Sequence, residues 1–179
     1  MQTQLVRSSI RTHFGGFQAP SPAELVKHDG FDELEKEDAL RFFPGKSWQD
    51  LLNHLRSIAH HPTLGGWYVL EEWSVLEPAA ISYYARAYLE HLIDTVESDA
   101  PDEFNISAFF GSLYQIVYSA RHESMPDAEW EIFSLTAHCI AMQQWASSID
   151  ADFAPETARG LLAELAAKRP ALARSNPAA

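Results

Sequence analysis

The residue types that could carry metal or acid–base chemistry gather in residues 59–77, a stretch without regular periodicity. It contains His60, His61, Glu71 and Glu72. Adjacent residues point apart on any regular element, and none of the eight histidines has the HxxxH or HExxH spacing that holds one metal ion. We therefore expect surface or core histidines and no metal site. A small-molecule or metal-dependent enzyme with its site in this loop stays open as the alternative, because loops often carry catalytic groups.

Motifs for a catalytic nucleophile or a bound phosphate are missing from the sequence. The serines do not lie in GxSxG, and Gly15-Gly16 and Gly65-Gly66 belong to neither GxGxxG nor a P-loop. Cys139 is the only cysteine and lies in an apolar helical stretch, which excludes an internal disulfide and favours an inert buried thiol. The sequence predicts no catalytic residue and no cofactor, and a non-enzymatic protein is favoured.

Acidic residues are concentrated in two acid-rich segments, residues 29–38 and 94–103. The first contains Asp29, Asp32, Glu33, Glu35, Glu37 and Asp38 against the single base Lys36, and the second contains Asp94, Glu97, Asp99, Asp102 and Glu103 against none. Like charges this close repel one another and cost folding stability. A solvated face is the commoner explanation, and the functional one is a docking surface for a cationic protein, where charge speeds encounter and sets specificity.

Tyr83 and Arg86 form a second candidate contact, on the expected helix over residues 78–97. Tyrosine and arginine are frequent anchors of protein interfaces. Tyr83 lies beside the apolar face of this helix. A partner-binding edge and a plain core rim are therefore both open for this residue.

The net charge of −12 is unevenly distributed along the chain. Residues 14–158 contain 24 acids and 7 bases, whereas residues 1–13 contain two arginines and no acid. An acidic body of this kind repels nucleic acid and anionic membrane and attracts basic partners. The sequence thus predicts a protein partner with a basic surface, no nucleic acid and no membrane, with simple solubility as the alternative reason for the charge.

The elements that would position these residues are helices. Residues 78–97 place Ile81, Tyr84, Tyr88 and Leu92 on one face, with Pro78 in the first turn. The other face, including Arg86 and the acids that follow it, is expected to meet water. Further helices are expected near residues 4–13, 22–28, 32–43, 48–58, 106–122, 126–148 and 155–168.

These patterns predict an all-α protein, with about six or seven helices packed around the central helix near 78–97. We expect a single helical domain over residues 1–169 and a flexible C-terminal tail over 170–179. No apolar run approaches the roughly 20 residues of a membrane helix, and residues 1–14 lack the pattern of a signal peptide. A cytoplasmic location is expected.

Two short motifs resemble a family of small, uncharacterised bacterial proteins. The first is Phe43-Pro-Gly-Lys-Ser-Trp-Gln-Asp-Leu51, and the second is Leu76-Glu-Pro-Ala-Ala-Ile-Ser-Tyr-Tyr-Ala-Arg-Ala-Tyr-Leu89. In that family a Gly-Lys-x-Trp turn precedes a helix with a Pro-x-Ala…Tyr-Tyr…Ala-Tyr-Leu pattern. Here Glu77 replaces a small cap residue and Ala85-Arg86 replaces Leu-Pro, which implies a straighter helix. The resemblance covers roughly residues 25–145 and implies a bacterial origin, but no catalytic residue.

The sequence as a whole favours a non-enzymatic acidic binding protein. By analogy with polymorphic-toxin immunity proteins, which are small, acidic and often helical, we expect an inhibitor that neutralises a basic toxin or effector by direct contact. The expected contact residues are Asp29, Asp32, Glu33, Glu35, Tyr83, Arg86, Asp94, Glu97, Asp99, Asp102 and Glu103.

Overall fold

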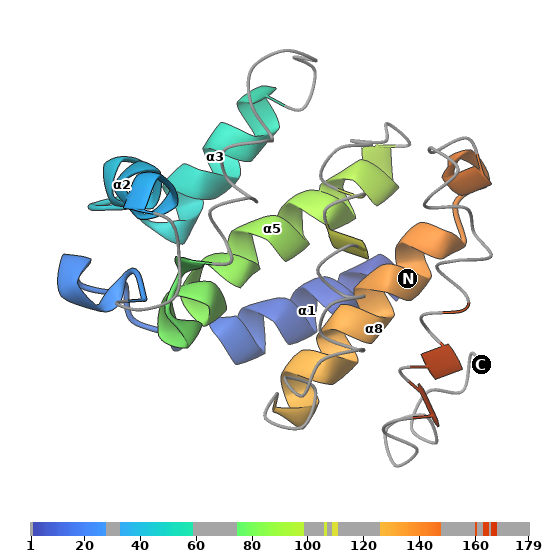
Figure 1. Ribbon diagram of the computed structural model, residues 1–179. Helices are drawn as coiled ribbons and strands as arrows, with labels where there is room; N and C mark the ends of the chain where they lie inside the picture. Colours follow the sequence, from blue (N-terminus) through green and yellow to red (C-terminus); the bar gives the residue numbers. More distant parts are fainter. Residues whose placement is uncertain are drawn as a thin grey trace. The chain divides into compact units, whose positions relative to one another are not determined.

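The computed structural model describes residues 2–27, 33–58, 75–98, 106, 109–110, 126–147, 160, 163–164 and 166–167. These residues are mostly helical, and no strand occurs among them (Figure 1). The five α-helices of the described residues are α1 (Gln2–Phe14), α2 (Glu33–Phe42), α3 (Trp48–Ile58), α5 (Pro78–Ser98) and α8 (Asp127–Ala141). The prediction of a mostly helical chain is confirmed, whereas the number of six or seven helices stays a prediction.

The chain divides into two compact units. One comprises Met1–Ser9 with Leu92–Ala179, and the other comprises Ile10–His91. Helices α1 and α5 each contribute to both units. The single domain expected over residues 1–169 stays a prediction, and residues 170–179 lie outside the described part of the chain.

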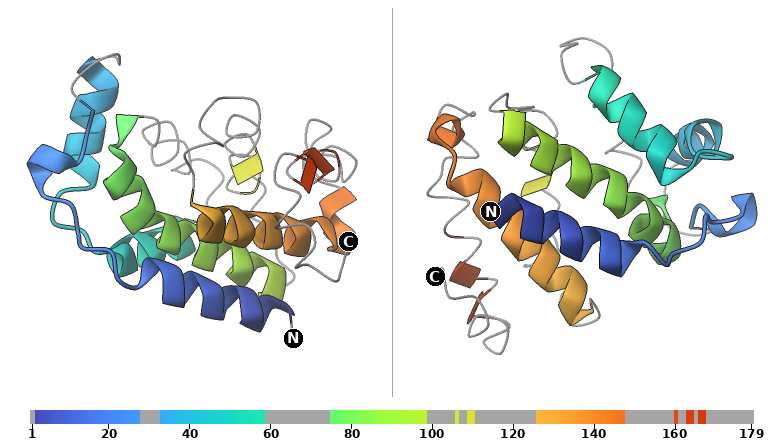
Figure 2. Two further views of the ribbon diagram at one scale, coloured as in Figure 1. Left: turned by 90° about the horizontal axis from the view of Figure 1, so that it is seen from below. Right: turned by 180° about the vertical axis from the view of Figure 1, so that it is seen from behind.

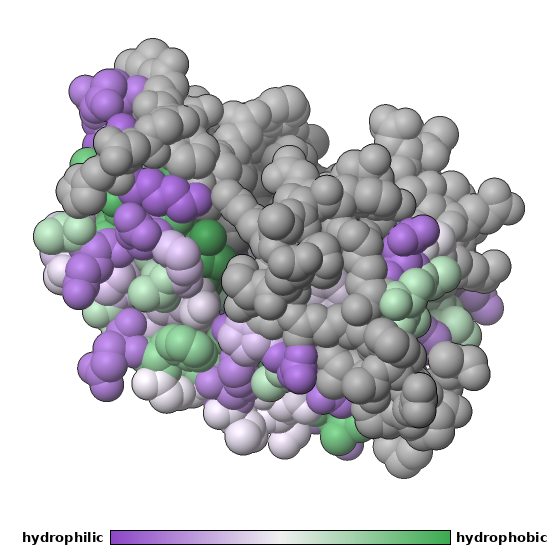
Figure 3. Space-filling model, turned by 60° about the horizontal axis from the view of Figure 1, so that its bottom comes forward, coloured by the Kyte–Doolittle hydropathy of each residue, from purple (hydrophilic) through white to green (hydrophobic). Residues whose placement is uncertain are grey.

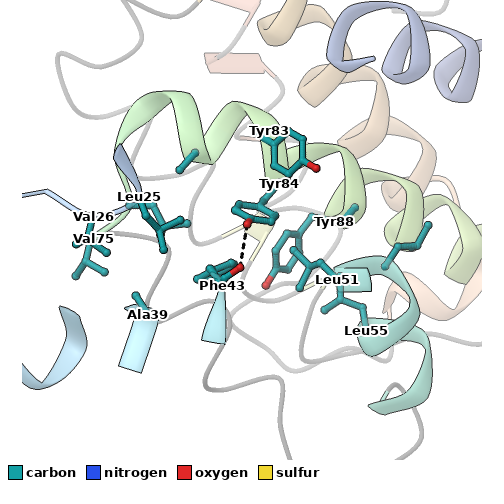
Figure 4. Packing of buried hydrophobic residues seen from close by; sticks show 14 residues of the cluster. Leu25, Val26, Ala39, Phe43, Leu51, Leu55, Val75, Tyr83, Tyr84 and Tyr88 are labelled. Atoms are coloured by element: carbon teal, nitrogen blue, oxygen red, sulfur yellow. Dashed lines mark hydrogen bonds between the residues drawn. The ribbon is translucent and has the colours of Figure 1, made fainter. Parts of the chain in front are cut away.

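The unit Ile10–His91 has its core along the first half of α5, with α2 and α3 packed beside it (Figures 1 and 2). Tyr84 is 1% exposed, and its ring lies 4.8 Å from that of Phe43 (Figure 4). Its hydroxyl donates to the carbonyl oxygens of Phe43 and Lys46, at 3.2 and 3.1 Å. Tyr84 therefore holds the turn between α2 and α3, where Gly45 has a φ of 76° that L-residues with a side chain rarely adopt.

The start of α3 follows directly from its sequence. The Ser47 hydroxyl accepts a hydrogen bond from the Asp50 backbone N–H at 3.1 Å, and the Asp50 carboxylate accepts from the Ser47 backbone N–H at 2.8 Å. This reciprocal cap satisfies two backbone donors that the helix itself leaves unpaired. Leu51, Leu52 and Leu55 then bury one face of α3.

A two-turn helix over residues 22–28 was expected, and that expectation is wrong. The capping box of Ser21 and Glu24 is present, but only a single 3-10 turn follows it, Pro22–Glu24. The Lys27 N–H donates to the Val75 carbonyl at 2.8 Å, and the Glu77 N–H donates to the Leu25 carbonyl at 2.9 Å. This short antiparallel bridge takes the backbone groups that a longer helix would have used.

The polar face of α5 was expected to meet water, and for Glu90 this is wrong. Glu90 is 3% exposed, and its carboxylate accepts a hydrogen bond from Arg11 Nε at 3.0 Å. Helix α1 covers this face, because Val6, Ile10 and Phe14 need a surface on which to bury. The polar face of α5 therefore packs against α1 through an ion pair.

The unit that contains α8 is built on a largely buried helix. Nine of its 15 residues are buried, among them Trp130, Ile132, Leu135 and Ile140. Its helix is shorter than the expected 126–148, since it ends at Ala141 and a 3-10 turn follows over Gln144–Ser147.

Cys139 lies on the buried helix α8, as the sequence predicted. Its side chain is 3% exposed, and burial raises the pKa of its thiol. Because the thiolate is the reactive form, both observations agree with an inert cysteine.

Candidate functional site

The first acid-rich segment presents exposed carboxylates on α2. Side-chain exposure is 84% for Glu33, 58% for Glu37 and 43% for Asp38. Arg41 binds Glu37 at 3.0 Å and Asp38 at 3.3 Å, while Lys36 binds Glu33 at 3.1 Å. The other members of this segment, Asp29, Asp32 and the side chain of Glu35, lie outside the described residues.

The second acid-rich segment is bound by a base from near the start of the chain. Arg7 Nη2 donates to Asp94 at 2.6 Å and to Glu97 at 2.7 Å, and the Arg7 side chain is 14% exposed. The hydrogen bond from Arg7 lowers the pKa of Glu97. Asp99, Asp102 and Glu103 lie outside the described residues.

Both segments stay acidic when the bases that pair with them are counted. Residues 29–41 contain six acids against Lys36 and Arg41, a formal charge of −4. Residues 94–103 contain five acids, and the partner Arg7 brings that segment also to −4. The ion pairs therefore reduce the negative charge that the sequence indicates without removing it.

Tyr83 is a core residue and not an exposed edge. It is 7% exposed, belongs to the same buried cluster as Tyr84, and its hydroxyl accepts a hydrogen bond from the Trp48 backbone N–H at 3.3 Å. This hydrogen bond ties the first residue of α3 to α5. Of the two interpretations left open by the sequence, the core rim is the one that this burial supports.

Arg86 is half-buried and lies one turn along α5 from Tyr83. The central carbon of its guanidinium group lies 3.6 Å from the centre of the Trp48 ring, so that cation and indole are stacked. Its Nε is buried and has no hydrogen-bond partner in the described part of the chain. A buried donor without an acceptor costs about 1–3 kcal/mol of folding free energy. The packing of this guanidinium group therefore has to outweigh the cost of the missing hydrogen bond.

A cavity of about 430 Å³ opens beside this stacked pair, within the unit Ile10–His91. Its walls come from three helices: Arg11 of α1, Trp48, Gln49, Leu52 and Arg56 of α3, and Arg86 and Glu90 of α5. Three arginines and one glutamate among these described residues give the lining of this arginine-lined cavity a formal charge of +2, in a chain whose net charge is −12.

The electrostatics of the arginine-lined cavity follow from burial and from neighbouring charge. Burial lowers the pKa of Arg86, Arg11 lowers it further, and Glu90 opposes both effects. Arginine nevertheless stays protonated in proteins, so the cost of the close positive charges remains in the folded chain. An anion in the cavity would relieve that cost.

Sequence reasoning identified Arg86 but missed the rest of this cavity. The signal lay in spacing: Trp48, Leu52 and Arg56 recur every fourth residue on α3, as do Arg86 and Glu90 on α5. Each set lies on one helix face. What could not be read from the sequence is that α1 brings Arg11 to the same place.

The loop proposed as an enzyme site is the irregular stretch over residues 59–77. His60, His61, Glu71 and Glu72 lie outside the described part of the chain. Among the residues that are described, no three histidine, cysteine or acidic side chains are grouped so that they could hold a metal ion.

The surface of the described residues is mixed in character. On the face drawn in Figure 3, hydrophilic residues alternate with hydrophobic ones and no single kind covers it. Among the described residues, no helix is both long enough and apolar enough to cross a membrane.

No protein-family model, no curated protein and no solved structure matches this chain. The resemblance to small uncharacterised bacterial proteins therefore stays a prediction. Any function of this chain has to be inferred from its own residues.

Proposed function

We propose that the chain is a non-enzymatic binding protein whose acid-rich segments engage a protein partner with a basic face. The observation that supports this proposal most is the residual charge of −4 in each segment after the internal bases Lys36, Arg41 and Arg7 are counted. On α2 the carboxylates of Glu33 and Glu37 are more than half exposed, so they are available to a partner as well as to Lys36 and Arg41.

The expected contribution of these carboxylates is kinetic. Exposed ion pairs add at most about 1 kcal/mol each to affinity, because solvent screens them and long side chains lose freedom. A charged face raises the rate of encounter with an oppositely charged protein much more strongly, and salt removes the effect. The partner should therefore associate quickly at low salt.

A finer form of the proposal is an immunity-type inhibitor that neutralises a basic bacterial toxin or effector by direct contact. Its support is the analogy of size, acidity and helical content with immunity proteins, together with the two resembling motifs. In this form of the proposal, the acid-rich segments bind the basic surface of the toxin or effector and cover it.

Charge reversal on α2 tests the proposal. Glu33→Lys with Glu37→Lys changes the net charge by +4 and removes only pairs within one helix whose carboxylates are exposed, worth a few tenths of a kcal/mol each. The matched control reverses Glu131 and Glu164, two exposed acids outside both segments, with the same change in net charge.

The measurement is the association rate of a partner captured from source-cell lysate on the immobilised chain. The α2 variant should associate several-fold more slowly at low salt, and the control should stay close to the original chain. Equal slowing by the two variants would show that only net charge matters, and no slowing by either would refute the proposed surface.

A further inference from the structure

We propose that the arginine-lined cavity binds a small organic molecule through a doubly charged oxyanion, of the phosphate-monoester kind. This site is separate from the acid-rich segments and takes a ligand of the opposite charge, so it does not depend on the proposed function.

Charge is the first argument. Among the described residues that line the cavity, Arg11, Arg56 and Arg86 are the bases and Glu90 is the acid, which gives this lining a formal charge of +2. The charge of Arg11 disfavours that of Arg86, and Glu90 already binds Arg11. A phosphate monoester carries about −1.5 to −2 charges near pH 7, so one such group balances the excess.

Pre-organisation is the second argument. Trp48 stacks on the Arg86 guanidinium at 3.6 Å, and Glu90 holds Arg11 Nε at 3.0 Å. Two of the three cations are therefore fixed before a ligand arrives, which lowers the entropy that binding must lose. Guanidinium groups match the oxygens of phosphate in pairs of parallel hydrogen bonds.

Size and lining are the third argument, and they indicate an organic body on the anion. The cavity volume of about 430 Å³ falls within the range of small-molecule sites, roughly 300–1,000 Å³, and exceeds the need of a bare ion. Leu52 and the indole of Trp48 supply apolar wall, and Gln49 supplies an amide at the exposed side. In this site an aryl or alkyl group packs on Leu52 and Trp48 while its phosphate binds the arginines.

Arg56 is an exposed residue of the cavity lining. Arg56→Gln removes one of the three cations of this lining. Arg86→Lys keeps the charge but loses Nε and the planar stack on Trp48. The matched control is Arg41→Gln, an exposed arginine of α2 that lies outside the cavity lining.

The experiment titrates the full chain with phenyl phosphate, with inorganic phosphate and with neutral phenol. Affinity is measured by calorimetry, and the side-chain Nε–H resonance of Arg86 is followed by NMR. We expect saturable binding of phenyl phosphate, weaker binding of inorganic phosphate, none of phenol, and a shift of the Arg86 resonance. Arg86→Lys and Arg56→Gln should each weaken phenyl phosphate about ten-fold or more, and Arg41→Gln should change it less than two-fold.

Three results would overturn the inference. The first is the absence of saturable binding by either anion. The second is equal weakening by Arg41→Gln, which would show general attraction to surface cations. The third is inorganic phosphate binding as tightly as phenyl phosphate, which would remove the organic body from the proposal.

Discussion

Replacing Arg7 by glutamine removes both ion pairs that this side chain makes with α5. The guanidinium lies 2.6 Å from Asp94 and 2.7 Å from Glu97, and the Arg7 side chain is 14% exposed. A fully exposed pair is worth at most about 1 kcal/mol, and a hydrogen bond to a charged group about 1.5–3 kcal/mol when it is buried. The two carboxylates are 27% and 41% exposed, so the expected loss lies between these limits, at about 1–2 kcal/mol in total.

The assay is equilibrium unfolding by urea, with heat unfolding as a second readout. A loss of 1 kcal/mol lowers the Tm of a chain of this size by about 2–4 °C, so Arg7→Gln should lower it by about 2–8 °C. The loss should shrink at high salt, because the pairs are only partly buried. The control is Arg41→Gln, whose side chain is 72% exposed and which should cost no more than about 0.5 kcal/mol.

Acidic pH gives an independent check on the Arg7 pairs. Arg7 lowers the pKa of Glu97 in the folded chain below its ordinary value of 4.5. Stability from a lowered carboxyl pKa is present above the unfolded value and disappears as the pH falls through the folded value. The difference between the original chain and Arg7→Gln should therefore hold at pH 7 and shrink below about pH 4.5. A difference that is absent at neutral pH and low salt would refute the reasoning.

Three further substitutions or reagents test the core. Tyr83→Ala should cost about 3–5 kcal/mol of unfolding free energy, because it empties a buried site and removes the acceptor of the Trp48 N–H. Tyr84→Phe should cost about 1–2 kcal/mol of unfolding free energy. Since burial raises the pKa of Tyr84 to about 12, its phenol should not ionise near pH 10, the ordinary range of tyrosine, in a spectrophotometric titration. Cys139 should react with a thiol reagent only as the chain unfolds, so rapid reaction in native buffer would contradict its burial.

Helices were predictable where a local signal defines their ends. Residues 48–58 form α3 within the expected bounds, because Ser47 and Asp50 cap its start and apolar spacing runs to its end. Helix α5 begins at Pro78 for the same local reason, since proline needs no N–H partner in the first turn. In both helices the information lies within a few residues of the boundary.

The failures of sequence reasoning come from pairing across long sequence distances. Residues 25–27 leave the helix because their backbone bonds to residues 75–77. Glu90 is buried because Arg11, 79 positions earlier, covers it. Helical periodicity distinguishes a polar from an apolar face, but it does not say whether the polar face meets water or another helix. The arginine-lined cavity was not predicted for the same reason, because its residues come from three separate helices.

The most direct test of the proposed function is the salt dependence of the partner's association rate. The rate should fall steeply for the original chain between low salt and about 0.15 M, where the Debye length is about 8 Å. The variant Glu33→Lys with Glu37→Lys should start lower and fall much less, because it has lost exposed acids from α2. Identical rates and identical salt dependence for the two proteins would contradict the claim that the acid-rich segments guide the partner.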